Sequence, residues 1–332
     1  MRSLSRALLA VVAVLAATLL AAGCSSGGGA PAPGKSHPSA PKSAAPTASP
    51  VGTAAPTLAT GQYVALGDSY TAAPKISGPV GAPLGCGRST DSYPMLVAQR
   101  LGLPASRFTD VSCDGATIGD LTGSQVTGSG TNPAQLDALS PATTLVTLGI
   151  GGNDVHWTSV LGECVKLDFG TVLMGSSAAQ HSDRCQQHYT AGGANQVKQY
   201  IQAVAAPLAT ALAQIKERAP SARIYVIGYP DLIPASSGSA CEHTFGITLA
   251  DMAYLNTAEQ QLNTVLSQQA AAAGATYVNT YTPSLGHSGC AAKNSRWVEP
   301  WLPESPAYPL HPNASGERGM ASAVVDALDA AG

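Results

Sequence analysis

A serine, a glycine, an asparagine and a histidine stand at positions in this chain where acyl-transfer chemistry would need them. Ser69 follows the apolar run of residues 63–66 and the Gly-Asp pair after it, and His311 lies near the other end of the chain. A serine is a useful nucleophile when a base takes its proton, and histidine is the usual base near neutral pH. The Gly115 N–H and the Asn153 amide are donors of the kind that an oxyanion requires, as is the N–H of Ser69 itself. Together these residue types predict a nucleophilic serine with a base and an oxyanion hole.

The first three of these residues follow predicted strands, and His311 precedes a predicted helix. The apolar runs that we predict as strands are Tyr63–Leu66, Phe108–Val111, Thr144–Gly149, Arg223–Ile227 and Thr276–Val278. Helical patterns lie between several of them. Strands that alternate with helices form a parallel sheet with helices on both faces. Residues just after the strands then gather outside the carboxyl ends of the sheet, which is where sites form in such folds.

Four segments have apolar residues at helical spacing. They are Pro94–Leu101 with Gly102 as a stop signal, Val197–Ile215 with a kink at Pro207, Met252–Leu266 ended by Gly274, and Met320–Leu328 beginning near Asn313 or Ser315. Residues 157–195 have no clear periodicity. We interpret that stretch as an insertion pinned by a disulfide, forming a wall of the substrate cleft. The tryptophans at 157, 297 and 301 fit either an acyl pocket or an ordinary core.

The N-terminal part predicts export. Residues 1–23 have a positively charged start and an Ala/Leu/Val run, as in a signal peptide. The run stops at Cys24, which favours a lipoprotein signal whose cysteine carries the lipid; the alternative is a plain secretory signal with a chance cysteine. Residues 24–60 are rich in Gly, Pro, Ala, Ser and Thr, which predicts a disordered tether. Residues 61–332 are enough for one folded domain.

The amino-acid composition limits the classes of partner that this chain can bind. The formal net charge is −3 and only 11% of residues are charged, so a basic nucleic-acid surface is excluded. Six cysteines remain beside Cys24, and an even set in an exported chain predicts three disulfides, with fifteen pairings open from spacing alone. They are Cys86, Cys113, Cys164, Cys185, Cys241 and Cys290. Because neither a CxxC pair nor an HExxH motif occurs, a metal site is disfavoured.

The four polar positions resemble the motifs of a known family, the SGNH or GDSL-type esterases and lipases. The matching residues are Ser69 in Gly-Asp-Ser-Tyr, Gly115, Asn153 in Gly-Gly-Asn-Asp, and His311, in the family's order. The resemblance implies a three-layer α/β/α fold with a five-stranded, flavodoxin-like parallel sheet. It also implies hydrolysis of carboxyl esters through an acyl-enzyme. It supports a sequential disulfide pairing, 86–113, 164–185 and 241–290, as in secreted actinobacterial members.

The sequence departs from the family pattern at one position. The family usually has an aspartate three residues before the histidine, and Tyr308 stands there. Glu304 is the nearest preceding carboxylate, seven residues before His311. We therefore predict a dyad of Ser69 and His311, in which the main-chain carbonyl of Tyr308 orients the imidazole, with Glu304 as the alternative.

The function predicted from these patterns is that of an exported, membrane-tethered esterase or lipase. It requires no cofactor or metal, acts on an ester or lipid substrate, and works as a monomer. A carbohydrate O-deacetylase or a phospholipase on the same site is one alternative, since the fold alone does not decide among them. A non-catalytic cell-surface binding protein on a hydrolase fold is another.

Overall fold

The computed structural model describes residues 61–175, 182–235 and 238–331. The predicted signal peptide, Cys24 and the tether lie outside these residues. Contacts divide the chain into two units, at residues 1–52 and 53–332, and the fold below is that of the second. Within the described ranges, no helix combines the length and the apolar character needed to cross a membrane.

A five-stranded parallel sheet forms the centre of the domain, and all five predicted strands are confirmed within one residue. The strands are β1 (Gln62–Gly67), β2 (Phe108–Asp110), β5 (Thr143–Gly149), β6 (Arg223–Ile227) and β7 (Thr276–Val278). Their spatial order is β2-β1-β5-β6-β7, and every neighbouring pair is parallel. The chain winds outward in opposite directions from β1 and β5. A crevice opens at such a reversal, outside the carboxyl ends of the two strands.

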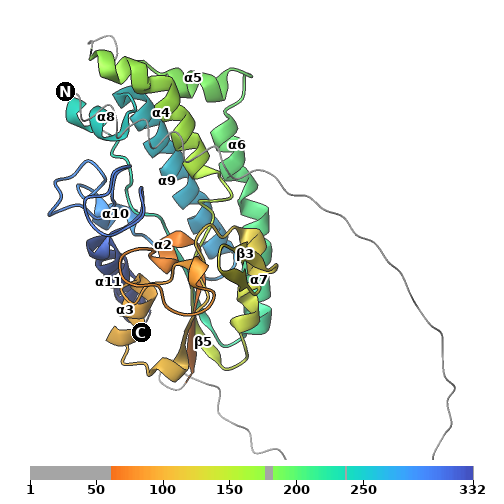
Figure 1. Ribbon diagram of the computed structural model, residues 1–332. Coiled ribbons are helices and arrows are strands. Elements are labelled where there is room, and N and C mark those ends of the chain that lie inside the picture. Colours follow the sequence, from red (N-terminus) through yellow and green to blue (C-terminus); the bar gives the residue numbers. More distant parts are fainter. Residues whose placement is uncertain (1–60, 176–181, 236–237, 332) are drawn as a thin grey trace, which may run out of the picture. The chain divides into compact units, whose positions relative to one another are not determined.

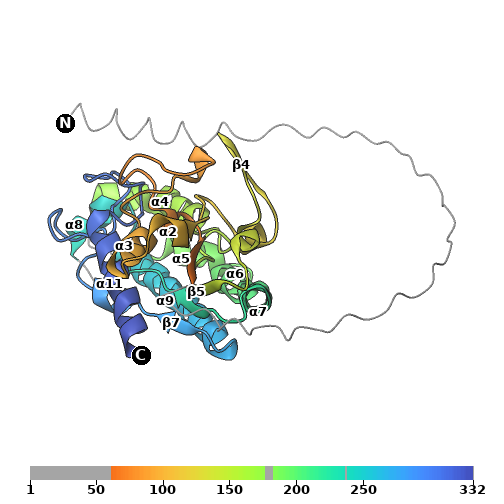
Figure 2. The same ribbon diagram turned by 90° about the horizontal axis from the view of Figure 1, so that it is seen from below.

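Alternate strand residues face two separate cores, which makes the domain three-layered. Val64 and Leu66 belong to one cluster of buried side chains, whereas Tyr63 and Ala65 belong to the other. The first cluster includes buried residues of α4 (Trp157–Met174), α6 (Gln196–Ala203), α7 (Ala205–Arg218) and α9 (Leu249–Ala272). The second includes those of α3 (Tyr93–Arg100) and α11 (Ala314–Ala330). Figure 1 and Figure 2 show α3 and α11 on one side of the sheet and α6 and α7 on the other.

The predicted helices are present. They are α3 (Tyr93–Arg100), α6 (Gln196–Ala203), α7 (Ala205–Arg218), α9 (Leu249–Ala272) and α11 (Ala314–Ala330). The kink predicted at Pro207 is a full break at Val204 between α6 and α7. Proline lacks an N–H and its ring clashes with the carbonyl four residues earlier, here that of Ala203, so the helix divides just after that residue. Asn313 caps α11 by accepting from the N–H groups of Ser315 and Gly316.

No helix was predicted over residues 157–195, where the sequence shows no clear periodicity. The stretch contains α4 (Trp157–Met174) and α5 (Arg184–Thr190). The periodicity of α4 is hidden because the charged Asp168 occupies a buried position, while Leu173 and Met174 are 71% and 81% exposed. In Figure 1, α4 and α5 lie above α2 (Ser69–Ala72), with α8 (Ser239–Phe245) beside them.

Several smaller elements within the described residues were not predicted. An antiparallel hairpin of β3 (Gln125–Thr127) and β4 (Gly130–Asn132) forms a second, small sheet. A short helix, α10 (Tyr281–Ser284), follows β7, and four 3₁₀ turns join the larger elements. These turns are η1 (Leu84–Cys86), η2 (Ala105–Arg107), η3 (Ile118–Leu121) and η4 (Gln135–Ala138).

The three disulfides pair in the predicted sequential order, Cys86–Cys113, Cys164–Cys185 and Cys241–Cys290. The first joins the segment after α2 to the loop after β2. The second joins α4 to α5, so the pinning predicted for residues 157–195 is present, although between helices. Three disulfides fit a protein that folds outside the reducing cytoplasm.

Candidate active site

Ser69 is the first residue of α2 and follows a sharp turn at Gly67 that only glycine allows. β1 ends at Gly67, whose φ is +153°, and a Cβ there would collide with the Gly149 carbonyl oxygen. Asp68 follows as the N-cap of α2, and its carboxylate accepts from the Tyr70 N–H at 2.9 Å. In the described residues, no acceptor meets the N–H of Ser69. The turn therefore holds the serine at the end of β1 with its own amide available.

His311 contacts Ser69 directly. Its Nε2 lies 2.7 Å from Ser69 Oγ, and its Nδ1 lies 2.7 Å from the main-chain oxygen of Pro309. A carbonyl oxygen only accepts, so Nδ1 carries the proton, Nε2 accepts, and the serine hydroxyl donates. The predicted partner of the imidazole, the Tyr308 carbonyl, was wrong by one residue. Leu310 has a φ of +65°, and the resulting tight turn brings the His311 backbone N–H onto the Tyr308 oxygen at 3.2 Å.

A buried glutamate holds the loop that carries His311. The backbone of Glu299 pairs with this loop on both sides: its N–H donates to the His311 oxygen at 2.9 Å, and its oxygen accepts from Leu310 at 3.0 Å. The Glu299 carboxylate is fully buried and accepts from the Asn313 side chain at 2.7 Å and the Glu304 N–H at 2.9 Å. Burial alone would raise its pKa, but these hydrogen bonds hold the pKa of Glu299 below its ordinary value.

Asn153 lies after β5 and is tied to the loop after β2. Its Nδ2 donates to the Ala116 oxygen at 2.8 Å, which fixes the amide and leaves its second N–H for another acceptor. The neighbouring Asp154 carboxylate accepts from the Ile118 N–H at 3.1 Å. The loops after β2 and β5, the two strands that flank β1, are thus joined by side chains of consecutive residues. Asn153 lines the same pocket as Ser69 and His311.

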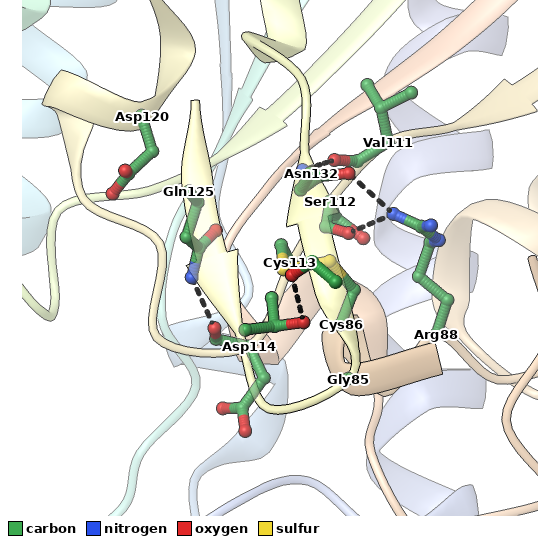
Figure 3. Close-up of a disulfide and its surroundings, with 12 residues drawn as sticks. Gly85, Cys86, Arg88, Val111, Ser112, Cys113, Asp114, Asp120, Gln125 and Asn132 are labelled. Atoms are coloured by element: carbon green, nitrogen blue, oxygen red, sulfur yellow. Dashed lines mark hydrogen bonds between the residues drawn. A yellow bond between two sulfur atoms is a disulfide. The ribbon is translucent and has the colours of Figure 1, made fainter. Parts of the chain in front are cut away.

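Gly115 lies on the exposed loop after β2, with a φ of +75°. Its N–H interacts with the carboxylate of Asp114, so the Gly115 amide has a partner within the protein and its part in an oxyanion hole stays a prediction. Figure 3 shows how the loop is held. The disulfide between Cys86 and Cys113 anchors it, and Gln125 Nε2 of the hairpin donates to the main-chain oxygen of Asp114 at 2.7 Å.

The pocket lies over the carboxyl ends of β1 and β5. Its lining residues are Asp68, Ser69, Tyr70, Asp114, Gly152, Asn153, Trp157, Thr158, Tyr229, Glu259, Leu262, Leu310 and His311. The start of α4 therefore does form a wall of the cleft, through Trp157. Trp297, by contrast, stacks on His287 with ring centres 5.0 Å apart, and Trp301 packs against the core. No group of three or more His, Cys, Asp or Glu side chains within the described ranges is arranged to hold a metal ion.

Burial changes the acid–base properties of two groups in this pocket. Desolvation lowers the pKa of His311 to about 4, against the opposing hydrogen bond to the Pro309 oxygen, which favours the protonated ring. The imidazole is half-buried, so we expect its pKa to lie between this value and the ordinary value of about 6.5. Desolvation also raises the pKa of Asp68 to about 7, although Tyr229 and Tyr70 donate to its carboxylate. Because its pKa lies below 7, His311 is neutral and able to accept a proton at neutral pH.

Comparison with known proteins identifies the family. Residues 65–318 match the sequence model of the GDSL-like Lipase/Acylhydrolase family. The chain belongs to this family. The five-stranded parallel fold that the SGNH resemblance implied is present.

The relatives of this GDSL-like chain include lipases and an esterase. It is 36% identical to Lipase 2 of Streptomyces coelicolor over 276 residues, which cover 83% of this chain and 87% of the relative. Lipase 1 of the same organism is 31% identical, with 83% and 90% covered. A phospholipase A1 from Streptomyces albidoflavus superposes with a TM-score of 0.62 at 28% identity, over 80% of this chain and 98% of that one. The family and these relatives make the chain a carboxylic-ester hydrolase.

Two side chains that position His311 in this GDSL-like hydrolase were not predicted. The Tyr70 hydroxyl donates to the Leu310 oxygen at 2.5 Å, and its ring lies 4.9 Å from the imidazole. Tyr70 directly follows Ser69, so one short segment supplies both the serine and a clamp on the histidine loop. Glu299 is the second, as described above. Adjacency to the Gly-Asp-Ser motif was a signal for Tyr70; no sequence signal marked Glu299.

Glu304, the alternative acid, does not reach the imidazole. Its carboxylate pairs with Arg296 at 3.1 Å and is 54% exposed. We expect Glu304→Gln to leave kcat/KM within about twofold and to change the free energy of unfolding by less than about 1 kcal/mol, as exposed ion pairs usually do. Steady-state kinetics on a p-nitrophenyl ester and a denaturant melt test this. A tenfold loss of kcat with unchanged stability would make Glu304 the orienting acid instead.

Proposed function

We propose that this chain is an exported serine esterase or lipase that cleaves carboxyl esters through an acyl-enzyme on Ser69, with His311 as the general base. The observation that carries the proposal is the contact of 2.7 Å between Ser69 Oγ and a neutral His311 Nε2, with Nδ1 held by the Pro309 oxygen. That arrangement is a nucleophile joined to an oriented base, which is the minimum that serine catalysis requires.

The reaction follows from this arrangement in two steps. Ser69 Oγ attacks the ester carbonyl carbon as His311 Nε2 takes the hydroxyl proton. The tetrahedral intermediate collapses, the bond to the alcohol oxygen breaks, and the proton on Nε2 passes to the departing alcohol. Water then attacks the acyl-enzyme with His311 again as base, which releases the acid and restores Ser69. The Pro309 carbonyl fixes the tautomer, although it stabilises the imidazolium less than a carboxylate would.

The oxyanion of the intermediate needs donors, and we assign this role to the Ser69 N–H, the Asn153 amide and the Gly115 N–H. Asn153 is the donor whose removal is cleanest to test. We expect Asn153→Ala to lower kcat by about 10²–10³-fold while KM changes little, since the donor acts mainly on the transition state. Asn279→Ala removes an exposed amide whose hydrogen bonds, among the described residues, go to Thr282 of α10, and it should retain full activity. Equal activity of the two variants would remove Asn153 from the oxyanion hole.

The substrate class is tested with a panel of p-nitrophenyl esters of increasing chain length and an acetylated glycan. The pocket has apolar walls at Trp157, Leu262 and Leu310 beside the serine. We expect hydrolysis of esters longer than acetate, as the names of the relatives suggest for this chain. Activity restricted to acetyl esters would contradict the lipase assignment and favour the O-deacetylase. A chain that hydrolyses no member of the panel would favour the binding protein.

The location of the enzyme is the remaining part of the proposal. Residues 1–23 would direct export, Cys24 would carry the lipid anchor, and residues 24–60 would tether a monomeric catalytic domain at residues 61–332. The even cysteine set and the three disulfides support export. Labelling cells with a radioactive fatty acid tests the anchor: Cys24→Ala should lose the label and release the enzyme into the medium.

A further inference from the structure

Tyr229 stands at the end of a strand that supplies none of the four motif residues. It follows β6 by two residues and is 7% exposed. Asn263 of α9 grips its backbone on both sides, accepting from the Tyr229 N–H at 2.8 Å and donating to the Tyr229 oxygen at 2.9 Å. The Tyr229 ring packs edge-on against the Tyr70 ring, with ring centres 5.1 Å apart. The side chain is therefore held rigidly where it lines the pocket.

The Tyr229 hydroxyl joins the two loops that carry the catalytic groups. It donates to the carboxylate of Asp68, the residue before Ser69, and it accepts from the Gly152 N–H, the residue before Asn153, at 2.8 Å. Gly152 also lies tightly against the phenol ring, since an added Cβ would be only 3.2 Å from the hydroxyl oxygen. The Tyr229 hydroxyl oxygen thus forms hydrogen bonds with the residue before the proposed nucleophile and with the residue before the proposed oxyanion donor.

The charge pattern explains why this bridge needs a hydroxyl. Asp68 is 1% exposed, and Asp114 and Asp154 add negative charge nearby. A buried carboxylate in such surroundings requires donors, and the only two that bond to it within the described residues are the Tyr229 O–H and the Tyr70 N–H. Without the hydroxyl, both the Asp68 carboxylate and the Gly152 N–H would lose a partner, and the two loops would lose their shared contact.

We infer that Tyr229 is a positioning residue that sets the spacing between Ser69 and the Asn153 amide through hydrogen bonds to Asp68 and Gly152. The inference rests on the proposed function. Catalytic geometry tolerates little displacement, and a misplacement of about 1 Å can cost on the order of 10²-fold in rate. Loss of this bridge therefore acts on the oxyanion hole although Tyr229 itself transfers no proton.

The test is Tyr229→Phe, which keeps the ring and removes only the hydroxyl. We expect kcat on p-nitrophenyl butyrate to fall by about 10–100-fold with KM within twofold. Tyr63→Phe is the matched control, because it also removes a buried hydroxyl bond, to Thr147 on the opposite face of the sheet. It should lose comparable thermal stability and keep its kcat. Asp68→Asn offers a second variant of the same volume: with its oxygen kept on the Tyr70 N–H, its amide would donate to the tyrosine oxygen, which reverses this hydrogen bond and removes the charge of the carboxylate.

A double-mutant cycle separates positioning from general loosening. If Tyr229 acts through Asn153, then Tyr229→Phe should cost less than threefold in the Asn153→Ala background. The same loss in both backgrounds, or full activity of both Tyr229→Phe and Asp68→Asn, would overturn the inference. These outcomes leave the proposed function intact, because the native enzyme would still hydrolyse the ester and lose activity with Ser69→Ala. An inactive native enzyme would instead contradict the proposed function.

Discussion

Ser69→Ala is expected to lower kcat for p-nitrophenyl butyrate by about 10⁶-fold, to the level at which only binding and oxyanion stabilisation remain. No other group in the pocket can replace it, because the His311 Nε2 that activates the serine points at Ser69 Oγ and at no other hydroxyl. The fold should be unaffected. The cap of α2 is the Asp68 side chain, and alanine fits the helical position that serine occupies.

Ser92→Ala is the control for this result. Ser92 is buried like Ser69 and also stands at the start of a helix, but its hydroxyl has no hydrogen-bond partner among the described residues. We expect Ser92→Ala to keep both stability and activity. If Ser69→Ala retained more than about a hundredth of the native kcat, the nucleophile would have to be sought elsewhere, because a missing nucleophile normally costs far more.

His311→Ala is expected to have an effect of the same order, because the serine and the base act as a unit. Removing either one should cost nearly as much as removing both, so the Ser69→Ala, His311→Ala double variant should be little worse than the single variants. Tyr254→Phe, which loses only a hydroxyl bond to Asn195, serves as a control for changes in stability. Additive losses in the double variant would show that the two residues act independently.

The same histidine predicts the pH dependence of the enzyme. Burial lowers the pKa of His311 to about 4, with the half-buried ring placing it between that value and about 6.5. The base is neutral above its pKa, so the acid limb of kcat/KM that His311 produces should lie within this interval, with activity lost as the pH drops through it. A profile of kcat/KM in buffers of constant ionic strength measures it. An acid limb centred above pH 7 would contradict the structure.

The chemistry of the site was largely predictable from the sequence because the fold brings strand ends together. Ser69 and Asn153 follow β1 and β5, which are neighbours in the sheet, so a nucleophile and an amide on these strand ends must be close. The parallel sheet itself followed from five short apolar runs separated by helices. Ser69, Asn153 and His311 could therefore be expected at one site before any distance was known, and they line one pocket, whereas the role of Gly115 stays a prediction.

The interactions that hold these residues were not predictable in the same way. The partner of the imidazole depends on the φ of +65° at Leu310, which no motif encodes, so the expected carbonyl was one residue away from the Pro309 oxygen that makes the contact. Tyr229 forms hydrogen bonds to segments distant in the chain, and the buried Glu299 bonds to residues 304–313, but no motif marks either residue. α4 was missed because a buried Asp168 and an exposed Met174 reverse the usual apolar pattern.

The most direct test of the central claim is covalent labelling by a fluorophosphonate, followed by intact-mass and peptide mass spectrometry. The probe reacts with a serine that an oriented base activates, and it traps the group that would carry the acyl chain. We predict one adduct per native chain, located on Ser69, with labelling absent in Ser69→Ala and strongly slowed in His311→Ala. A native protein that takes no label, or an adduct that persists in Ser69→Ala, would contradict the assignment of Ser69 as the nucleophile.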